Sequence, residues 1–215
     1  MTVPSAFLEI PLFEHLSARE KAVLYANATL LRFDQEEMFI KNEILLFSVF
    51  YIYEGEVKIK NEHNQLIDLL GATDFLGFRY LFNEDPVFFS GYGTKGTQII
   101  QFDKNIIKQF VLTNSKFMSE VYNRSMGNVS ALTERLLSYK THKINGSLAD
   151  FLLHYHAKNC LRFLKQKEIS EVLGYSREIV CKCMKDFTNE GYISYDDDAI
   201  TIHNIDALKA IKGFS

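Results

Sequence analysis

The feature that most constrains the fold is a pair of predicted helices near the C-terminus, joined by a short glycine turn. The first helix is predicted over Gln166–Leu173 and ends at Gly174, a residue suited to a left-handed turn. Ser176 follows as a predicted N-cap. The second helix is then predicted over Arg177–Asn189 and stops at Gly191. Helix, tight turn, cap and second helix together indicate a helix-turn-helix.

Two short strands after this helix pair strengthen the interpretation. Alternating segments at Tyr192–Tyr195 and Ala199–Ile202 flank an acidic turn at Asp196–Asp198, which predicts a wing. A helix pair followed by a wing is typical of DNA-binding domains, and a further helix is predicted ahead of it over Ser147–His156. We therefore predict a winged helix-turn-helix DNA-binding domain over residues 147–215.

The second helix of the pair supplies the candidate base-reading residues, because its N-terminal end enters the major groove in such motifs. Arg177 can bond guanine bidentately and Glu178 can accept from cytosine, so the pair favours G·C base pairs. Glu178 shares one helical face with two lysines, whereas Ile179 is expected to face the core. The predicted DNA-binding residues are Ser176, Arg177, Glu178, Lys182, Lys185, Lys165 and Lys167.

The charge distribution agrees with a confined basic surface on an acidic protein. The net charge is −3, yet residues 158–185 hold seven Lys or Arg against three Glu. We assign Lys165, Lys167 and Lys185 to phosphate contacts, which add affinity without sequence information. A solvated helical face is the alternative explanation of the same charges.

The first hundred residues have a different texture. The first thirty are predicted as helix, with Ser17 and Glu20 as a capping box. From about Leu30 to Asp103, short segments alternate with period two, such as Val57–Lys60 and Thr97–Ile99. Many short strands at this spacing predict a sandwich or barrel.

Residues 104–139 return to a helical pattern that carries two apolar stripes. One stripe, at Phe117 and Val121, is expected to pack on the barrel. The other follows steps of four and three and predicts a coiled-coil dimer seam, with a helix buried within one chain as the alternative. The predicted seam is Met118, Tyr122, Ser125, Val129, Leu132, Leu136 and Tyr139. The polar stretch Lys140–Gly146 is the predicted hinge.

Composition excludes several classes of protein. No apolar run approaches the roughly 18 residues of a membrane span, and no signal peptide is recognisable, so we expect a soluble cytoplasmic protein without membrane contact. The three cysteines form no disulfide framework. The sequence has no phosphate loop, nucleophile motif or adequate metal-ligand cluster, and we do not expect an enzyme or a metal site.

Several segments of the sequence resemble those of a known protein family. Gly174–Val180 resembles the Gly-x-Ser-Arg-Glu-Thr-Val recognition sequence of the cyclic-AMP receptor protein/FNR (Crp/Fnr) family of bacterial transcription regulators, and Leu12–Leu16, Tyr51–Val57 and Leu69–Phe82 resemble its earlier parts. The resemblance implies an α+β fold: a β-roll sensor (cupin-like, similar to a cyclic-nucleotide-binding domain), a dimerisation helix and a winged helix-turn-helix. It implies a homodimer on palindromic double-stranded DNA, with RNA polymerase as a partner.

Combining both lines, we expect four parts in the chain. These are a sensor at 1–110, a dimerisation helix at 111–140, a hinge at 141–146 and the DNA-binding domain at 147–215.

The sensor departs from the cyclic-nucleotide-binding pattern. Phe78 stands where those family members carry the ribose-binding Glu, and Ser90–Gly93 offers no phosphate-binding Arg. We retain Gly77, Phe78 and Arg79 as a candidate effector pocket, but we do not expect a response to cyclic AMP. In the recognition helix, Lys182 replaces the family's usual Arg, which predicts altered specificity.

Iron–sulfur clusters and haem are other cofactors of the family that the sequence resembles. The iron–sulfur members need four cysteines mostly near the N-terminus, and the first cysteine here is Cys160, so no cluster is expected. Haem is left open, although His15 and His63 lie in no motif. The sequence does not identify the effector, the operator, the direction of regulation or any redox role of Cys181 or Cys183. The alternative hypothesis is a haem- or other small-molecule-binding sensor that acts mainly through protein partners, with a vestigial DNA-binding domain.

Overall fold

The protein is described by a computed structural model that covers residues 3–141, 143–196 and 199–214. It divides into two compact units. The first comprises the chain up to Val57 together with Leu70–Ser130, and the second comprises Lys58–Leu69 together with the chain from Ala131. The predicted order of parts, with β-sheets in the N-terminal half, helices after them and a helix-turn-helix at the C-terminal end, is confirmed.

The first unit starts with short helical elements. Two 3-10 helices, η1 (Ser5–Glu9) and η2 (Pro11–Phe13), precede α1 (Ala18–Ala26). The predicted capping box is present: the backbone N–H of Glu20 donates to Ser17 Oγ at 3.2 Å, and the backbone N–H of Ser17 donates to the Glu20 carboxylate at 2.7 Å. The expectation of helix over the first thirty residues is wrong at its end, because the chain enters strand β1 at Ala28 to pair with β8.

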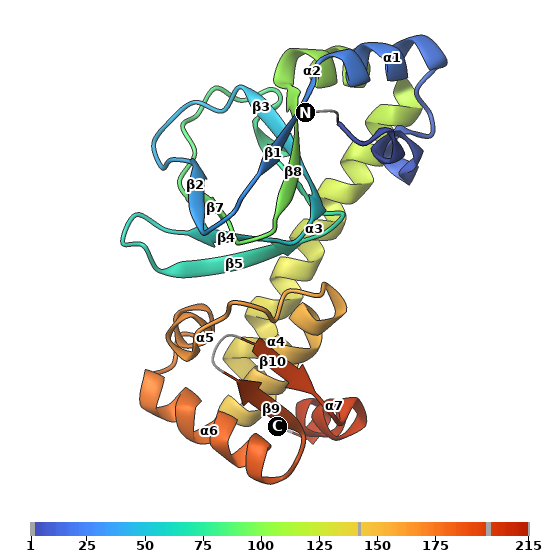
Figure 1. The fold of residues 1–215 in the computed structure, drawn as a ribbon. Coiled ribbons are helices and arrows are strands. Elements are labelled where there is room, and N and C mark those ends of the chain that lie inside the picture. The colour runs from blue at the N-terminus through green and yellow to red at the C-terminus, as the bar shows by residue number, and fades with distance from the viewer. Residues whose placement is uncertain (1–2, 142, 197–198, 215) are drawn as a thin grey trace. The chain divides into compact units, whose positions relative to one another are not determined.

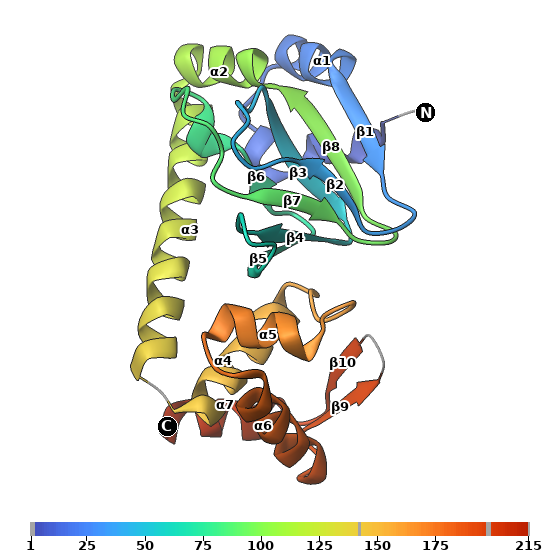
Figure 2. The ribbon, with the colours of Figure 1, turned by 90° about the vertical axis from the view of Figure 1, so that its left-hand side faces the viewer.

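Residues 28–103 form the predicted β structure. Its elements are β1 (Ala28–Arg32), β2 (Glu37–Ile40), β3 (Ser48–Glu54), β4 (Glu56–Lys60), β5 (Leu66–Gly71), β6 (Phe75–Leu76), η3 (Phe78–Tyr80), β7 (Ser90–Gly93) and β8 (Gln98–Asp103). They make two four-stranded sheets, in the orders β1-β8-β3-β6 and β2-β7-β4-β5. The first sheet is antiparallel throughout, with Tyr51 and Leu30 on either side of Ile100. In both views of the ribbon, α1 lies beside α2 at one end of this sheet (Figures 1 and 2).

The strand predicted from the period-two segment Val57–Lys60 is confirmed as β4, but burial of its side chains does not alternate. All five residues of Glu56–Lys60 are buried, including the charged ones. Lys58 is buried because its ammonium donates to acceptors in the second unit, to which it belongs: the Phe163 carbonyl at 2.7 Å and the Glu168 carboxylate at 2.8 Å. A period-two sequence therefore marks the strand but not an exposed face.

An aromatic core holds the first unit together. Phe13 packs edge-on against Phe102 with ring centroids 5.6 Å apart, and Phe117 stacks on Phe13 at 6.2 Å. Phe117 and Val121 are buried in this core, which confirms the predicted stripe facing the barrel.

The helical region predicted over 104–139 contains two helices, α2 (Lys104–Thr113) and α3 (Ser115–Thr141). The helical conformation is interrupted at Asn114, whose side-chain oxygen accepts a hydrogen bond from the backbone N–H of Phe117 at 3.1 Å. The Asn114 side chain therefore caps the start of α3. Short polar side chains bond to nearby backbone groups in this way, which favours a cap over continuation of the preceding helix.

The second unit contains the remaining elements. They are α4 (Ile144–Ala157), α5 (Gln166–Leu173), α6 (Arg177–Asn189), β9 (Ile193–Asp196), β10 (Ala199–Ile202) and α7 (Ile205–Phe214). The helix predicted over Ser147–His156 is confirmed as part of α4, whose inner face is formed by the fully buried side chains of Leu148, Phe151, Leu152 and Tyr155. The segment predicted as a hinge, 140–146, is helical at both ends, because α3 reaches Thr141 and α4 starts at Ile144; residue 142 lies outside the described residues. None of the helices in the described ranges is long and apolar enough to cross a membrane.

Candidate nucleic-acid interface

The two helices α5 and α6 form the predicted helix-turn-helix. Gly174 ends α5 in the left-handed region, with φ 72° and ψ 20°, which a residue with a Cβ adopts at a cost. Ser176 then caps α6, its Oγ accepting from the backbone N–H of Ile179 at 3.4 Å. Gly191, also with φ 72°, follows the end of α6. The turn chemistry predicted from sequence is confirmed at each of these positions.

The wing is also present in the second unit. Strands β9 and β10 pair antiparallel, with Ile193 opposite Ile202 and Tyr195 opposite Ile200. The predicted turn residues Asp197 and Asp198 lie outside the described residues. Figure 2 shows the β9–β10 hairpin next to α6.

The buried face of α6 packs on the core of the second unit through Val180, Cys183, Met184 and Phe187. This is the i, i+3, i+4, i+7 pattern of an amphipathic helix. The expectation that Ile179 faces the same core is wrong: its side chain is 46% exposed. Ile179 precedes the first residue of the buried stripe by one position, and 100° per residue turns it out of the core.

The opposite face of α6 presents the predicted base-reading residues. Arg177, Glu178, Lys182 and Lys185 are all exposed. The pKa of Glu178 lies below its usual value because the carboxylate accepts a hydrogen bond from its own backbone N–H and another from Ser176, and Arg177 adds a favourable charge. Glu178 is therefore ionised at neutral pH and acts only as an acceptor, as a contact to the cytosine amino group requires.

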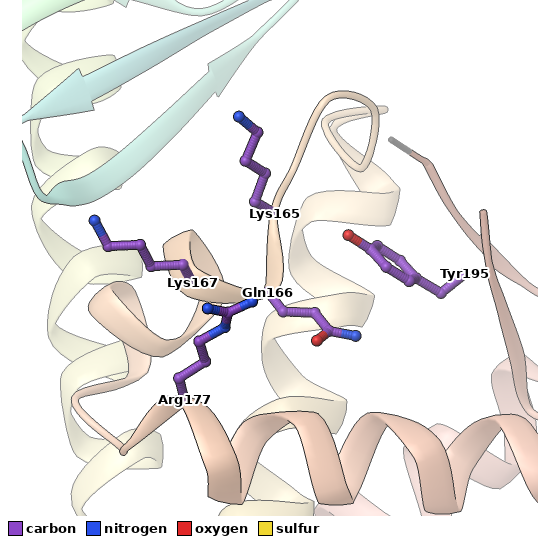
Figure 3. A pocket seen from close by; sticks show the side chains of 5 residues that line it. All are labelled: Lys165, Gln166, Lys167, Arg177 and Tyr195. Atoms are coloured by element: carbon purple, nitrogen blue, oxygen red, sulfur yellow. The ribbon is translucent and has the colours of Figure 1, made fainter. Parts of the chain in front are cut away.

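A basic depression of about 470 Å³ lies between the helix pair and the wing. It is lined by Lys165, Gln166, Lys167, Arg177 and Tyr195. Figure 3 shows the Arg177 guanidinium directed toward Gln166 at the start of α5, and the Tyr195 hydroxyl directed from the wing into the same space. Lys165 and Lys167 at the N-terminus of α5 and Arg177 at the N-terminus of α6 form a surface suited to an anion such as a backbone phosphate.

The start of α5 is fixed from both sides. The Glu168 carboxylate accepts from the backbone N–H of Lys165 at 2.9 Å. On the other side, the Cys181 thiol of α6 donates to the Gln166 side-chain oxygen at 2.7 Å. These bonds hold the depression in place relative to α6.

Sequence reasoning missed two residues of this depression, Gln166 and Tyr195. The first turn of a predicted helix marks Gln166 as a phosphate candidate once the helix-turn-helix is recognised. No sequence signal places Tyr195 there, because its position depends on how the wing folds back toward α5.

The candidate effector residues lie in the first unit, around η3. Gly77 has φ 112°, and a Cβ there would lie 2.8 Å from the Ser48 carbonyl oxygen, so the turn requires glycine. The Phe78 ring stacks on Phe75 with centroids 5.0 Å apart. Arg79 is exposed and lies over the Phe88 ring at 5.1 Å.

The predicted dimer seam lies on α3. Five of its residues have exposed side chains: Met118, Tyr122, Val129, Leu132 and Leu136. Met126 and Leu137 extend the exposed apolar surface and were not predicted. Ser125 and Tyr139 are only partly exposed. The Ser125 hydroxyl donates to the Val121 carbonyl at 2.8 Å, and Tyr139 packs against the core of the second unit.

The remaining candidates concern cysteines and metals. Cys160, Cys181 and Cys183 are free thiols, and burial raises the pKa of Cys183 to about 12. Within the described part of the chain, no group of three or more His, Cys, Asp or Glu side chains is arranged to hold a metal ion.

Comparison with known proteins agrees with this geometry. Residues 146–211 match the Crp-like helix-turn-helix domain family. A curated relative, the CRP-like cAMP-activated global transcriptional regulator of Mycobacterium tuberculosis, is 21% identical over 173 residues, which cover 74% of this chain and 77% of the relative.

Two solved structures share the fold over most of the chain. FixK2 from Bradyrhizobium japonicum superposes with a TM-score of 0.74 at 13% identity, covering 87% of this chain and 98% of its own. A putative Crp/Fnr-family transcriptional regulator from Eubacterium rectale superposes with a TM-score of 0.74 at 14% identity, covering 95% and 98%.

The fold and the exposed basic helix pair define a winged helix-turn-helix protein of the DNA-binding class. Residues 146–211 match the Crp-like helix-turn-helix domain family, and the chain shares its fold with FixK2 and with the putative Crp/Fnr-family regulator.

Proposed function

We propose that this chain is a homodimeric, sequence-specific regulator that places α6 of each protomer in the major groove of a palindromic operator. The observation that carries the proposal is the exposure of Arg177 and Glu178 on the first turn of α6, beside the basic depression. An Arg and an ionised Glu in adjacent positions select G·C pairs through guanine O6/N7 and cytosine N4.

Phosphate contacts complete the proposed interface. Lys165 and Lys167 at the start of α5 bind the backbone on one side of the groove, and Lys182 and Lys185 follow the exposed face of α6. The Ser176 hydroxyl accepts the capping hydrogen bond and donates its proton to the Glu178 carboxylate, so its place in the proposed interface is to orient the first turn of α6 and Glu178. These contacts set the position of α6 but carry no sequence information.

The proposed dimer forms through α3. Apolar side chains at intervals of three and four residues are exposed along this helix, which is the pattern that a partner helix covers in a coiled coil. Two protomers then present two α6 helices to half-sites about one helical turn apart, roughly 34–36 Å. In this arrangement RNA polymerase is the expected protein partner of the DNA-bound dimer.

We further propose that cyclic AMP is not the effector, although the curated relative is described as cAMP-activated. Phe78 occupies the position of the ribose-binding Glu in cyclic-nucleotide-binding members of the family. Its ring is engaged with Phe75, and the guanidinium next to it, Arg79, lies over Phe88. A carboxylate acceptor for the ribose hydroxyl is therefore missing from this turn.

The test is selection of bound sequences from a randomised duplex library at fixed salt, with and without cyclic AMP. We expect enrichment of a palindrome with G·C pairs in each half-site, to the same degree in both conditions. Recording absorbance from 350 to 700 nm on the same sample reports a haem or cluster. Binding without any sequence enrichment in either condition would contradict the proposed readout, and enrichment only with cyclic AMP would contradict the effector proposal.

A further inference from the structure

Ile179 is an exposed apolar side chain among the charged residues of α6. It is 46% exposed, and it is not among the side chains that pack on the core of the second unit. A β-branched residue gains nothing from helix propensity at an exposed position, where Ala or Glu is preferred. Packing and propensity therefore leave the isoleucine at this position unexplained.

The position of Ile179 is fixed by the helix cap. Its backbone N–H donates to Ser176 Oγ, which places Ile179 in the first turn of α6, directly after Arg177 and Glu178. Residues in this turn are the ones that meet base edges when a recognition helix enters the major groove. Lys182, one turn further along, is exposed beside it.

The major groove offers one apolar group, the C5-methyl of thymine. We propose that Ile179 reads a T·A pair in each half-site by packing on that methyl, next to the G·C contacts of Arg177 and Glu178. This inference rests on the proposed function, since it needs α6 in the groove, and it adds a specificity determinant. Each methyl removed from such a contact is expected to cost about fourfold in affinity, the equivalent of about 0.8 kcal/mol per buried methyl or methylene.

The test uses uracil, which lacks the methyl but pairs like thymine. Each T of the selected half-site is replaced by U in turn, and affinities of the wild-type protein and of Ile179→Ala are measured for both duplexes. We expect one T→U change to weaken wild-type binding about fourfold per half-site. Ile179→Ala is expected to bind the T duplex with a similar loss and to show no further loss on the U duplex.

Ile205→Ala is the matched control. Ile205 is also an isoleucine in the first turn of a helix and is 40% exposed, but it lies in α7. This variant is expected to keep the wild-type response to uracil. Thermal unfolding of both variants checks that the fold is retained.

The outcomes separate this inference from the proposed function. If the library yields a G·C palindrome but no T→U change weakens binding, the methyl contact is wrong and the regulator assignment stands. The same holds if Ile179→Ala binds more weakly than the wild type by the same factor on the T duplex and on the U duplex. If no sequence is enriched, the proposed readout fails, and the contact at Ile179 fails with it.

Discussion

The Nζ atom of Lys58 lies 2.8 Å from Oε1 of Glu168, and this ion pair joins a strand residue to a helix 110 residues further along the chain. Both side chains are nearly excluded from water, with 2% of the lysine and 12% of the glutamate exposed. Glu168 also accepts from the backbone N–H of Lys165, so the pair is part of what holds α5 at its N-terminus.

Removing one partner of this pair is expected to destabilise the second unit. Lys58→Met leaves the Glu168 carboxylate buried without its ammonium, at a cost of about 3 kcal/mol. The double variant Lys58→Met, Glu168→Met is expected to recover more than half of that loss, because no unpaired charge remains. Urea unfolding followed by circular dichroism measures these differences. Lys209→Met, which removes an exposed partner of Asp206, is the control and should change stability by less than about 0.5 kcal/mol.

The lysines at the start of α5 are expected to act through charge alone. Lys165→Gln and Lys167→Gln should each weaken binding to all duplexes alike and reduce the slope of log affinity against log salt by about 1. The base preference should stay unchanged, because phosphate contacts carry no sequence information. Binding titrations at four salt concentrations, with Lys209→Gln as control, measure the slope. A change in the preferred sequence would show that these lysines reach base edges.

Assembly through α3 is tested by placing a charge in the seam. Leu136 is 60% exposed, and Leu136→Asp should shift the dimer to monomer at micromolar concentration, because a coiled-coil core position does not tolerate an unpaired carboxylate. Leu112, which is 68% exposed on α2, supplies the matched control, and Leu112→Asp should leave the dimer intact. Sedimentation equilibrium distinguishes the two states. A wild-type monomer, or a Leu136→Asp dimer, would contradict the proposed seam.

Acid sensitivity is expected from His154. Burial, with the neighbouring cations Arg135 and Lys158, lowers the pKa of His154 to about 4, while the carboxylates of Asp68 and Asp150 oppose that shift. A histidine in the unfolded chain has a pKa near 6.5. As the pH falls from about 6.5 toward 4, the unfolded state therefore binds a proton at His154 while the folded state does not, which favours unfolding.

The contribution of the neutral His154 side chain to the free energy of unfolding is therefore fully present above pH 6.5 and is lost as the pH falls below that value. Phenylalanine cannot be protonated, so the free energy of unfolding of His154→Phe should fall by about 1–2 kcal/mol less than that of the wild type between pH 7 and pH 4.5. This figure allows for solvent screening of the partly exposed side chain. Urea unfolding at both pH values measures the difference. Equal losses in the two proteins would show that His154 is not the acid-sensitive group.

Local sequence chemistry predicted much of the fold. The capping box at Ser17 and Glu20, the left-handed turn at Gly174 and the cap at Ser176 each depend on a few neighbouring residues, and all three are confirmed. The wing followed from alternation around an acidic turn in the same way. Features that depend on distant partners were predicted less well.

The failures have physical causes of that kind. The buried state of Lys58 depends on Glu168, and the early end of the first helical region depends on pairing between β1 and β8. The exposure of Ile179 was missed because a one-residue shift of the buried stripe moves it from the core to the surface. For the interface, the charged residues of α6 were predicted from the motif, whereas Tyr195 enters only through the folding of the wing.

The most direct test of the account concerns Arg177. Once an operator has been selected, affinities are measured for duplexes carrying all four base pairs at each conserved G·C position, for the wild type, Arg177→Ala and the control Lys209→Ala. We expect the wild type and the control to prefer G·C at one position by about 1–3 kcal/mol, and Arg177→Ala to lose this preference while the preferences at the other positions remain. Retention of the full wild-type preference by Arg177→Ala would contradict the assignment of α6 as the base-reading helix through this residue.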